Sequence, residues 1–174
     1  MHYSALPLLD HPLAVLREMR ADDVEPMFRI LSQPAVVEHT SWNLTSASDL
    51  RAYGAQERSA GSMTRFAIVR RDEGSFIGSA GFHSVSPANR TAEIAYDLAP
   101  EVWGGGIARA ACEALTSWAF EHLGLVRVQG TTLVTNLRSQ RVLEGCGFAR
   151  ERLLRRLRMV RGTPGDFWMY SRLA

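Results

Sequence analysis

The sequence contains no lysine, and all 20 of its basic residues are arginines. This absence excludes two kinds of site, because a P-loop needs a lysine on the nucleotide phosphates and a pyridoxal enzyme needs one for its Schiff base. Long apolar runs are absent as well: no stretch approaches the roughly 20 consecutive apolar residues of a membrane-spanning helix. The N-terminal segment has no basic residue ahead of its short apolar stretch, which is atypical of a signal peptide. We therefore expect a cytoplasmic protein.

Cysteine and histidine are scarce. The two cysteines, Cys112 and Cys146, are too few for a disulfide framework, and we expect both to be buried as small apolar side chains. The five histidines are scattered, without a pair at i, i+4 or an HExxH motif, so the sequence predicts no metal site. A net charge of +2 is too small to indicate a nucleic-acid-binding protein.

The length of 174 residues, with 46% hydrophobic and 22% charged residues, is typical of one globular domain. We expect a lead segment at 1–12 and one domain at 13–174. Hydrophobic periodicity predicts a mixed α/β fold with one central sheet, and Trp118 is expected in its core. The predicted strands are 13–19, 65–70, 76–85, 92–98, 126–133, 148–160 and 167–173, the predicted helices are 22–31, 46–60, 107–123 and 136–146, and loops are expected at 32–45 and 162–165.

Six arginines lie between Arg150 and Arg161, in the first strand of the predicted terminal hairpin. Leu153, Leu157 and Met159 share one strand parity there, which predicts a strand with a solvated arginine face. An RNA-binding patch is the alternative. The same face also suits an acidic substrate or a phosphate group.

Three consecutive glycines, Gly104 to Gly106, join a predicted strand to the longest predicted helix. Glycine lets the backbone approach a ligand closely, and the unpaired N–H groups of a first helical turn point outward at the positive end of the helix dipole. This arrangement is typical of phosphate-binding sites, although a glycine cluster alone also fits a flexible turn. A dinucleotide-binding fold is not favoured, because Arg109 stands where that motif has its third glycine and the next strand lacks a terminal acid.

The run 103–108 (Trp-Gly-Gly-Gly-Ile-Ala) resembles the acetyl-CoA-binding motif R/Q-x-x-G-x-G/A of the GNAT superfamily of N-acetyltransferases. Segments 92–96 and 136–148 on either side resemble the RimJ/RimL-like branch of that superfamily. Trp103 replaces the arginine or glutamine of the motif, and tryptophan is frequent there in this branch. The resemblance covers the domain in element order. It implies a single GNAT domain whose central sheet is mixed, mostly antiparallel and splayed, with flanking helices.

The resemblance also implies acetyl-CoA as co-substrate and no metal. By resemblance, amides of the glycine turn cradle the CoA pyrophosphate, and the pantetheine arm lies where the strand of Tyr96 and Leu98 splays from its parallel neighbour. The Leu98 amide is then a candidate to polarise the acetyl carbonyl. The implied acetyl-CoA-binding residues are Tyr96, Leu98, Trp103, Gly104, Gly105, Gly106, Ile107, Ala108, Arg109, Asn136 and Ser139.

Several residues have a catalytic interpretation beside a structural one. Glu93 is the candidate base, because an α-amine with a pKa of about 8 must lose a proton before it attacks a thioester. The alternative interpretation of Glu93 is a salt-bridged sheet residue. Ser139 is the candidate proton donor to the departing thiol, or an ordinary first-turn residue. Asn136 fits a helix N-cap and a CoA contact, and Tyr96 a core aromatic or a proton donor. Trp42 borders the acceptor pocket by resemblance, or packs in the core.

The predicted activity is direct acetyl transfer to a primary amine in a ternary complex, with a protein N-terminal α-amine of the ribosomal type as the favoured acceptor. Small-molecule or antibiotic amines are the alternative acceptors. A non-catalytic module that senses acetyl-CoA is an alternative of another class. The terminal hairpin is a candidate surface for a homodimer.

Overall fold

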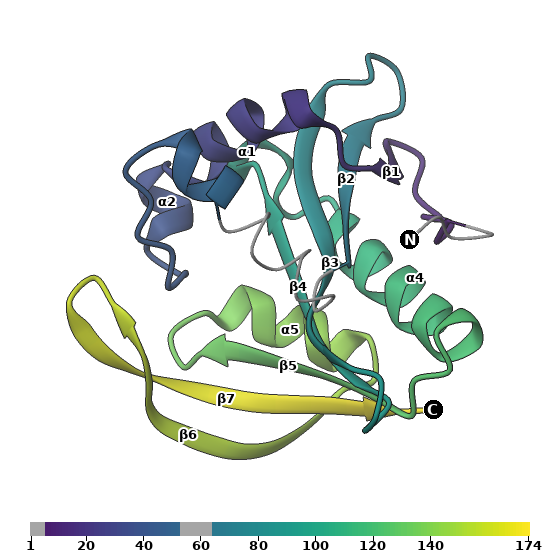
Figure 1. Cartoon of the computed structure of the whole chain (residues 1–174), viewed down its shortest axis with the longest axis vertical. Coiled ribbons are helices and arrows are strands. Elements are labelled where there is room, and N and C mark those ends of the chain that lie inside the picture. The colour runs from purple at the N-terminus through teal and green to yellow at the C-terminus, as the bar shows by residue number, and fades with distance from the viewer. Residues whose placement is uncertain (1–5, 53–63) are drawn as a thin grey trace.

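A seven-stranded sheet runs through the residues that the computed structural model describes, 6–52 and 64–174 (Figure 1). Its strand order is β1-β2-β3-β4-β5-β7-β6, and every neighbouring pair is antiparallel except β4 and β5. The strands are β1 (Ala14–Glu18), β2 (Thr64–Arg70), β3 (Phe76–Ser86), β4 (Thr91–Leu98), β5 (Arg127–Leu133), β6 (Ala149–Val160) and β7 (Thr163–Leu173). The predicted mixed, mostly antiparallel sheet is therefore confirmed.

The helices also follow the predicted order. They are the 3-10 turn η1 (Ala21–Asp23), α1 (Val24–Leu31), α2 (Pro34–Val37), the 3-10 turn η2 (Pro100–Val102), α4 (Ile107–His122) and α5 (Leu137–Gly145). Residues 47–52 are helical too, and the rest of the helix predicted at 46–60 lies outside the described residues. The loop expected at 32–45 is wrong in part, because Pro34 starts the short helix α2 with a φ angle already suited to a first turn. Among the described helices, none is long and apolar enough to span a membrane.

Helix α4 supplies much of the core. Its apolar stripe packs on the central strands, and Trp118 is buried with its ring edge-on to Phe66, 5.7 Å between centroids. Cys112 and Cys146 are both buried thiols, as predicted. A second apolar cluster lies under α1, around Met27 and Leu31.

The central feature for function is the separation of β4 from β5. These strands pair in parallel over only three positions, from Thr91 opposite Arg127 to Glu93 opposite Gln129. Beyond Glu93, β4 continues to Leu98 and β5 continues to Leu133, but the two strands no longer pair with each other. The predicted splay is confirmed, and we call the space between the two strand ends the strand gap.

The terminal hairpin departs from its prediction in two ways. The turn lies at Arg161 and Gly162, both with positive φ (48° and 76°), as two-residue hairpin turns prefer, and Thr163 already belongs to β7. Register shifts interrupt β6 at 150–152 and 154–158. Strict alternation is lost as a result: Met159 is 57% exposed, whereas Arg158 turns inward to the Thr131 hydroxyl.

Candidate active site

Every second residue of β4 directs its backbone N–H and C=O groups toward the strand gap. The Ala99 N–H donates to the Ile77 carbonyl on β3. Because hydrogen-bonding direction alternates along a strand, Tyr96 and Leu98 direct their backbone groups to the opposite edge, where β5 has moved away. The Leu98 carbonyl accepts a hydrogen bond from the Trp103 indole at 2.9 Å. The Leu98 N–H therefore faces the strand gap beside a fixed carbonyl.

The glycine turn forms the start of α4. Gly104 and Gly106 have φ angles of 81° and 83°, in the left-handed region that favours glycine. Gly106 is the N-cap of this 16-residue helix, and no side chain among the described residues caps it. The first-turn N–H groups are consequently available to an anion at the positive end of the dipole.

Two cavities of similar size adjoin the strand gap. The glycine-turn cavity, of about 430 Å³, is lined by the glycine turn, the start of α5 and part of α2. The Glu93 cavity, of about 440 Å³, is lined by β4, β5, the loop after α2 and the terminal hairpin. The residues that line both cavities are His39, Thr40, Tyr96, Asp97, Asn136 and Ser139. The cavities therefore meet at the strand gap.

The two cavities differ in charge. Three exposed arginines, Arg109, Arg138 and Arg141, line the glycine-turn cavity against one acid, Asp97. The Arg138 guanidinium stacks over the Trp103 ring, 4.6 Å from its centroid. An excess of arginine beside uncapped helical N–H groups fits the phosphate groups of CoA.

Side chains from α5 and β4 meet at the junction. The Asn136 side chain accepts a hydrogen bond from the Ser139 N–H at 3.1 Å, which confirms the predicted N-cap. The Tyr96 and Ser139 hydroxyls are 2.9 Å apart, and Tyr96 also reaches the Ser139 carbonyl at 3.3 Å. Burial raises the pKa of Tyr96 well above its ordinary range. Its phenol therefore stays protonated and serves as a hydrogen-bond partner, not as a base.

Glu93 lies on the opposite face of β4, because side chains alternate along the strand and Tyr96 points to α5. Its carboxylate accepts a hydrogen bond from the Thr131 hydroxyl at 2.5 Å, and the Arg158 guanidinium approaches the same oxygen at 3.3 Å. The His83 ring lies 3.8 Å away. Glu93 is only 7% exposed, yet it lines its cavity. The geometry thus combines the two interpretations, an ion-paired sheet residue and a carboxylate at a cavity wall.

Sequence reasoning missed several residues of the Glu93 cavity. Arg65 and Asp97 form an ion pair there, with side chains 10% and 12% exposed, and Arg65 also donates to the Ser79 hydroxyl at 2.9 Å. His39 lines both cavities, and its buried Nδ1 has no hydrogen-bond partner among the described residues, which is uncommon for a buried polar atom. No sequence motif marks these side chains, because elements far apart in the chain bring them together.

The structure distributes the predicted site residues between the two cavities. All the predicted acetyl-CoA-binding residues line the glycine-turn cavity except Gly105, whose carbonyl accepts a hydrogen bond from His11. Trp42 and Glu93, the predicted acceptor-binding residues, line the Glu93 cavity. Within the described residues, no group of three or more His, Cys, Asp or Glu side chains is placed to hold a metal ion.

The sequence and fold match known proteins. A family model described as "Acetyltransferase (GNAT) domain" matches residues 14–149. YoaA of Bacillus subtilis (strain 168), an uncharacterized N-acetyltransferase, is 33% identical over 172 residues, covering 95% of this chain and 96% of YoaA. RimJ of Mycobacterium smegmatis, solved in complex with CoA-disulfide, has 27% identity and a TM-score of 0.82, covering 92% of this chain and 82% of RimJ.

A third similar protein is spermidine N-acetyltransferase of Vibrio cholerae, solved in complex with CoA and spermine. Its TM-score is 0.83 at 20% identity, covering 92% of this chain and 95% of that protein, so the likeness concerns the fold. The family model, by contrast, spans most of this chain and includes both the strand gap and the glycine turn. The chain therefore belongs to the GNAT family of N-acetyltransferases, and acetyl-CoA is its co-substrate.

Proposed function

We propose that this enzyme transfers the acetyl group of acetyl-CoA directly to the N-terminal α-amine of a protein or peptide, in a ternary complex. The observation that carries this proposal is the meeting of the two cavities at the strand gap. Acetyl-CoA enters through the glycine-turn cavity and the amine through the Glu93 cavity. The reacting atoms then meet without a covalent enzyme intermediate, so positioning supplies much of the rate enhancement.

Acetyl-CoA binding rests mainly on the backbone. The N–H groups at the start of α4 receive the pyrophosphate, and Arg109, Arg138 and Arg141 offer cations to the remaining phosphate. The pantetheine arm lies along the gap-facing groups of β4. The Leu98 N–H then donates to the thioester carbonyl and stabilises the negative charge that develops on its oxygen.

Glu93 is proposed as the general base. It accepts a proton from the acceptor ammonium, directly or through one water, and the neutral amine then attacks the acetyl carbon to form a tetrahedral intermediate. The carbon–sulfur bond then breaks and the thiolate leaves. The Ser139 hydroxyl, which lies 2.9 Å from the Tyr96 hydroxyl, donates a proton to that thiolate and is reprotonated from solvent, and solvent also takes the second proton that the nitrogen loses.

The charge of the Glu93 cavity supports a peptide acceptor over a polyamine. Its two acids, Glu93 and Asp97, each face an arginine, Arg158 and Arg65. A polyamine carries several positive charges and needs unpaired acids to hold them. Because each of the two acids is paired with an arginine, the cavity has no excess of negative charge for a polyamine. A peptide N-terminus brings only the one amine that reacts and needs no such excess. The Trp42 indole lines the cavity as an apolar surface for a peptide side chain.

The test is a free-thiol assay with acetyl-CoA and matched acceptor pairs. Each peptide is supplied with a free and with a formylated α-amine, and spermidine is assayed beside them. We expect thiol release with the free α-amine peptides and little with the blocked peptides or spermidine. A clear preference for spermidine would contradict the acceptor assignment while leaving the transfer chemistry intact. Calorimetric binding of acetyl-CoA without turnover of any acceptor would instead support the sensor alternative.

A further inference from the structure

The segment ahead of β1 contacts the glycine turn. The His11 Nε2 atom lies 2.8 Å from the Gly105 carbonyl, across 94 positions of sequence. His11 lies outside the residues that the family model matches, 14–149. The contact therefore joins a residue outside the matched range to the glycine turn inside it.

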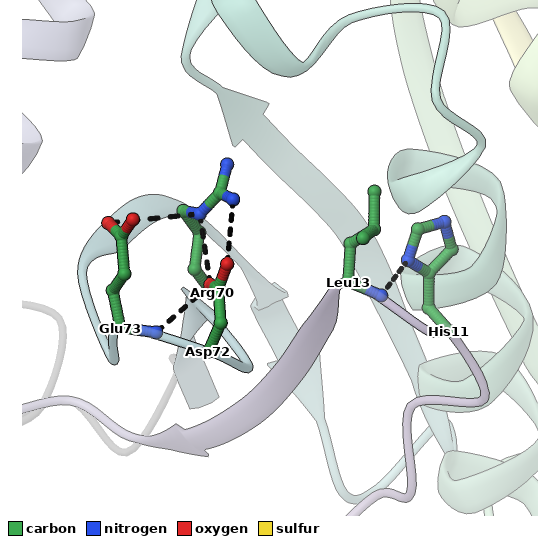
Figure 2. Close-up of polar contacts among 5 residues, drawn as sticks. All are labelled: His11, Leu13, Arg70, Asp72 and Glu73. Atoms are coloured by element: carbon green, nitrogen blue, oxygen red, sulfur yellow. Dashed lines mark hydrogen bonds and ion pairs between the residues drawn. The ribbon is translucent and has the colours of Figure 1, made fainter.

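The tautomer of His11 follows from a second hydrogen bond. The Leu13 N–H donates to His11 Nδ1 at 3.2 Å, which Figure 2 shows at the start of β1. A ring nitrogen that accepts a hydrogen bond carries no proton, so in the neutral imidazole the proton resides on Nε2. His11 consequently donates to the Gly105 carbonyl.

This hydrogen bond fixes the orientation of one peptide group in the turn. No peptide bond among the described residues is cis, so the Gly106 N–H points opposite to the Gly105 carbonyl. His11 holds the carbonyl on its own side, which aims the Gly106 N–H away from His11. Gly106, which carries this N–H, lines the glycine-turn cavity, and Gly105 does not.

A hydrogen bond that holds this peptide is useful because the backbone angles of glycine are only weakly restricted. Gly105 and Gly106 both lack the Cβ that would restrict their backbone angles, so the peptide between them can flip at small steric cost. The flipped peptide would present a carbonyl oxygen to the phosphate in place of an N–H. A hydrogen bond from a fixed donor opposes that flip.

His11 is well placed to be such a fixed donor. Leu9, two residues earlier, is 3% exposed and packs in the main core. The Arg71 guanidinium donates to the His11 carbonyl at 3.0 Å, and the Arg71 N–H donates to the Leu13 carbonyl. In Figure 2 the neighbouring Arg70 forms ion pairs with Asp72 and Glu73 in its own hairpin turn.

We propose that His11 is a positioning residue for acetyl-CoA: it locks the Gly105–Gly106 peptide with its N–H toward the pyrophosphate. The inference rests on the proposed binding of the pyrophosphate at the glycine turn. It assigns a function to the lead segment in co-substrate affinity, separate from the chemistry at the strand gap. The effect should accordingly appear in binding of the phosphate-bearing co-substrate and not in kcat.

The experiment compares His11→Phe, which keeps a ring but cannot donate, with His11→Gln, whose side-chain amide can donate from a similar reach. Affinity for CoA and for pantetheine, which lacks the pyrophosphate, is measured by calorimetry on the full chain. Steady-state rates with acetyl-CoA and with acetyl-pantetheine accompany them. Circular dichroism and thermal unfolding of each variant establish that it is folded.

We expect His11→Phe to weaken CoA binding roughly 10-fold, the effect of losing one well-placed hydrogen bond, and His11→Gln to recover most of the loss. Pantetheine binding and kcat should stay unchanged in both variants. Unchanged CoA affinity in His11→Phe, or an equal loss for CoA and pantetheine, would overturn the proposal. If the unmodified protein bound CoA no better than pantetheine, the placement of the pyrophosphate at the glycine turn would itself be wrong, and the proposal with it.

Discussion

The two cavities beside the strand gap have nearly the same volume, about 430 and 440 Å³, but they are built in different ways. The glycine-turn cavity takes much of its lining from one continuous segment, a strand end, Gly104, Gly106 and the first turn of α4, and α2 and α5 complete it. The Glu93 cavity takes its polar groups from five strands, a loop and the start of α5, including Arg65 on β2, Thr131 on β5 and Arg158 on β6. A local motif defines the first cavity, and only the tertiary fold defines the second.

This difference matches what each cavity is proposed to hold. Acetyl-CoA is a constant partner, and backbone amides at a helix start recognise its phosphate whatever the surrounding side chains are. The acceptor varies within the family, so its cavity relies on side chains, which change without disturbing the fold. The balanced pairs Glu93 with Arg158 and Asp97 with Arg65 are therefore expected to determine specificity in this chain.

The largest effect is expected from Asp97→Asn. The substitution leaves the Arg65 guanidinium, whose side chain is 10% exposed, without its carboxylate partner. Breaking a buried pair on one side costs about 3–5 kcal/mol of unfolding free energy. Urea unfolding followed by circular dichroism measures the loss. The double variant Arg65→Met with Asp97→Leu removes both charges and should recover much of it, and a loss below about 1 kcal/mol in the single variant would show that the pair is solvated.

Next in size is Glu93→Gln, which tests the chemistry of the same cavity. Loss of the base should lower kcat roughly 100-fold near pH 6, where the amine is protonated, and less as pH rises above the amine pKa. The affinity for acetyl-CoA should be nearly unchanged, since Glu93 does not line the glycine-turn cavity. Glu101→Gln is the matched control, an exposed glutamate before the glycine turn that lines neither cavity. A pH–rate profile of unchanged shape would contradict the role of Glu93 as base.

A smaller effect is expected from Gly106→Ala on the other cavity. An alanine Cβ at this position would have space, with only His11 Nε2 within 4 Å, at 3.9 Å, so the cost comes from the φ angle of 83°. Left-handed backbone costs a non-glycine residue roughly 1–2 kcal/mol. The loss appears in acetyl-CoA affinity if the turn relaxes and in unfolding free energy if it does not, so both are measured. Gly105→Ala, at a position without positive φ, should lose less in both measurements.

The glycine-turn cavity could be predicted from the sequence better than the Glu93 cavity, because the two are built in different ways. Gly104, Gly106 and Asn136 were identifiable because their backbone conformation selects the residue type: positive φ selects glycine, and an N-cap selects asparagine. The element order and the buried face of α4 were identifiable from hydrophobic periodicity, because apolar residues recur at helical spacing along all 16 residues of α4. These features depend on neighbours in the chain.

The Glu93 cavity was not identifiable in the same way. Strand alternation predicts Arg158 on a solvated arginine face, but the register shifts in β6 break the alternation and turn its guanidinium onto Thr131 and Glu93. Arg65 and Asp97 lie 32 positions apart and meet only because β2 and β4 flank β3. Periodicity predicts which face a residue occupies and carries no information about its partner across the sheet.

The smallest expected effect comes from an ion pair outside both cavities. Arg127 on β5 forms two hydrogen bonds with Glu151 on β6, at 2.8 and 2.7 Å, and the Glu151 side chain is 38% exposed. The Arg127 hydrogen bonds, with a further one from Ser171, lower the pKa of Glu151 to about 2. Glu151→Gln should cost only about 0.5 kcal/mol of unfolding free energy at neutral pH, because solvent screens exposed pairs.

The contribution of the Arg127–Glu151 pair to the unfolding free energy depends on pH in a defined direction. A carboxylate whose pKa is lower in the folded state than in the unfolded chain, about 4.3, stabilises the fold above that value and loses the contribution as pH falls toward 2. The difference in unfolding free energy between the native sequence and Glu151→Gln should therefore shrink between pH 4 and pH 2. Urea unfolding at several pH values measures it. If the difference instead exceeded that of Asp97→Asn, exposure would not be what separates this pair from the pair in the Glu93 cavity.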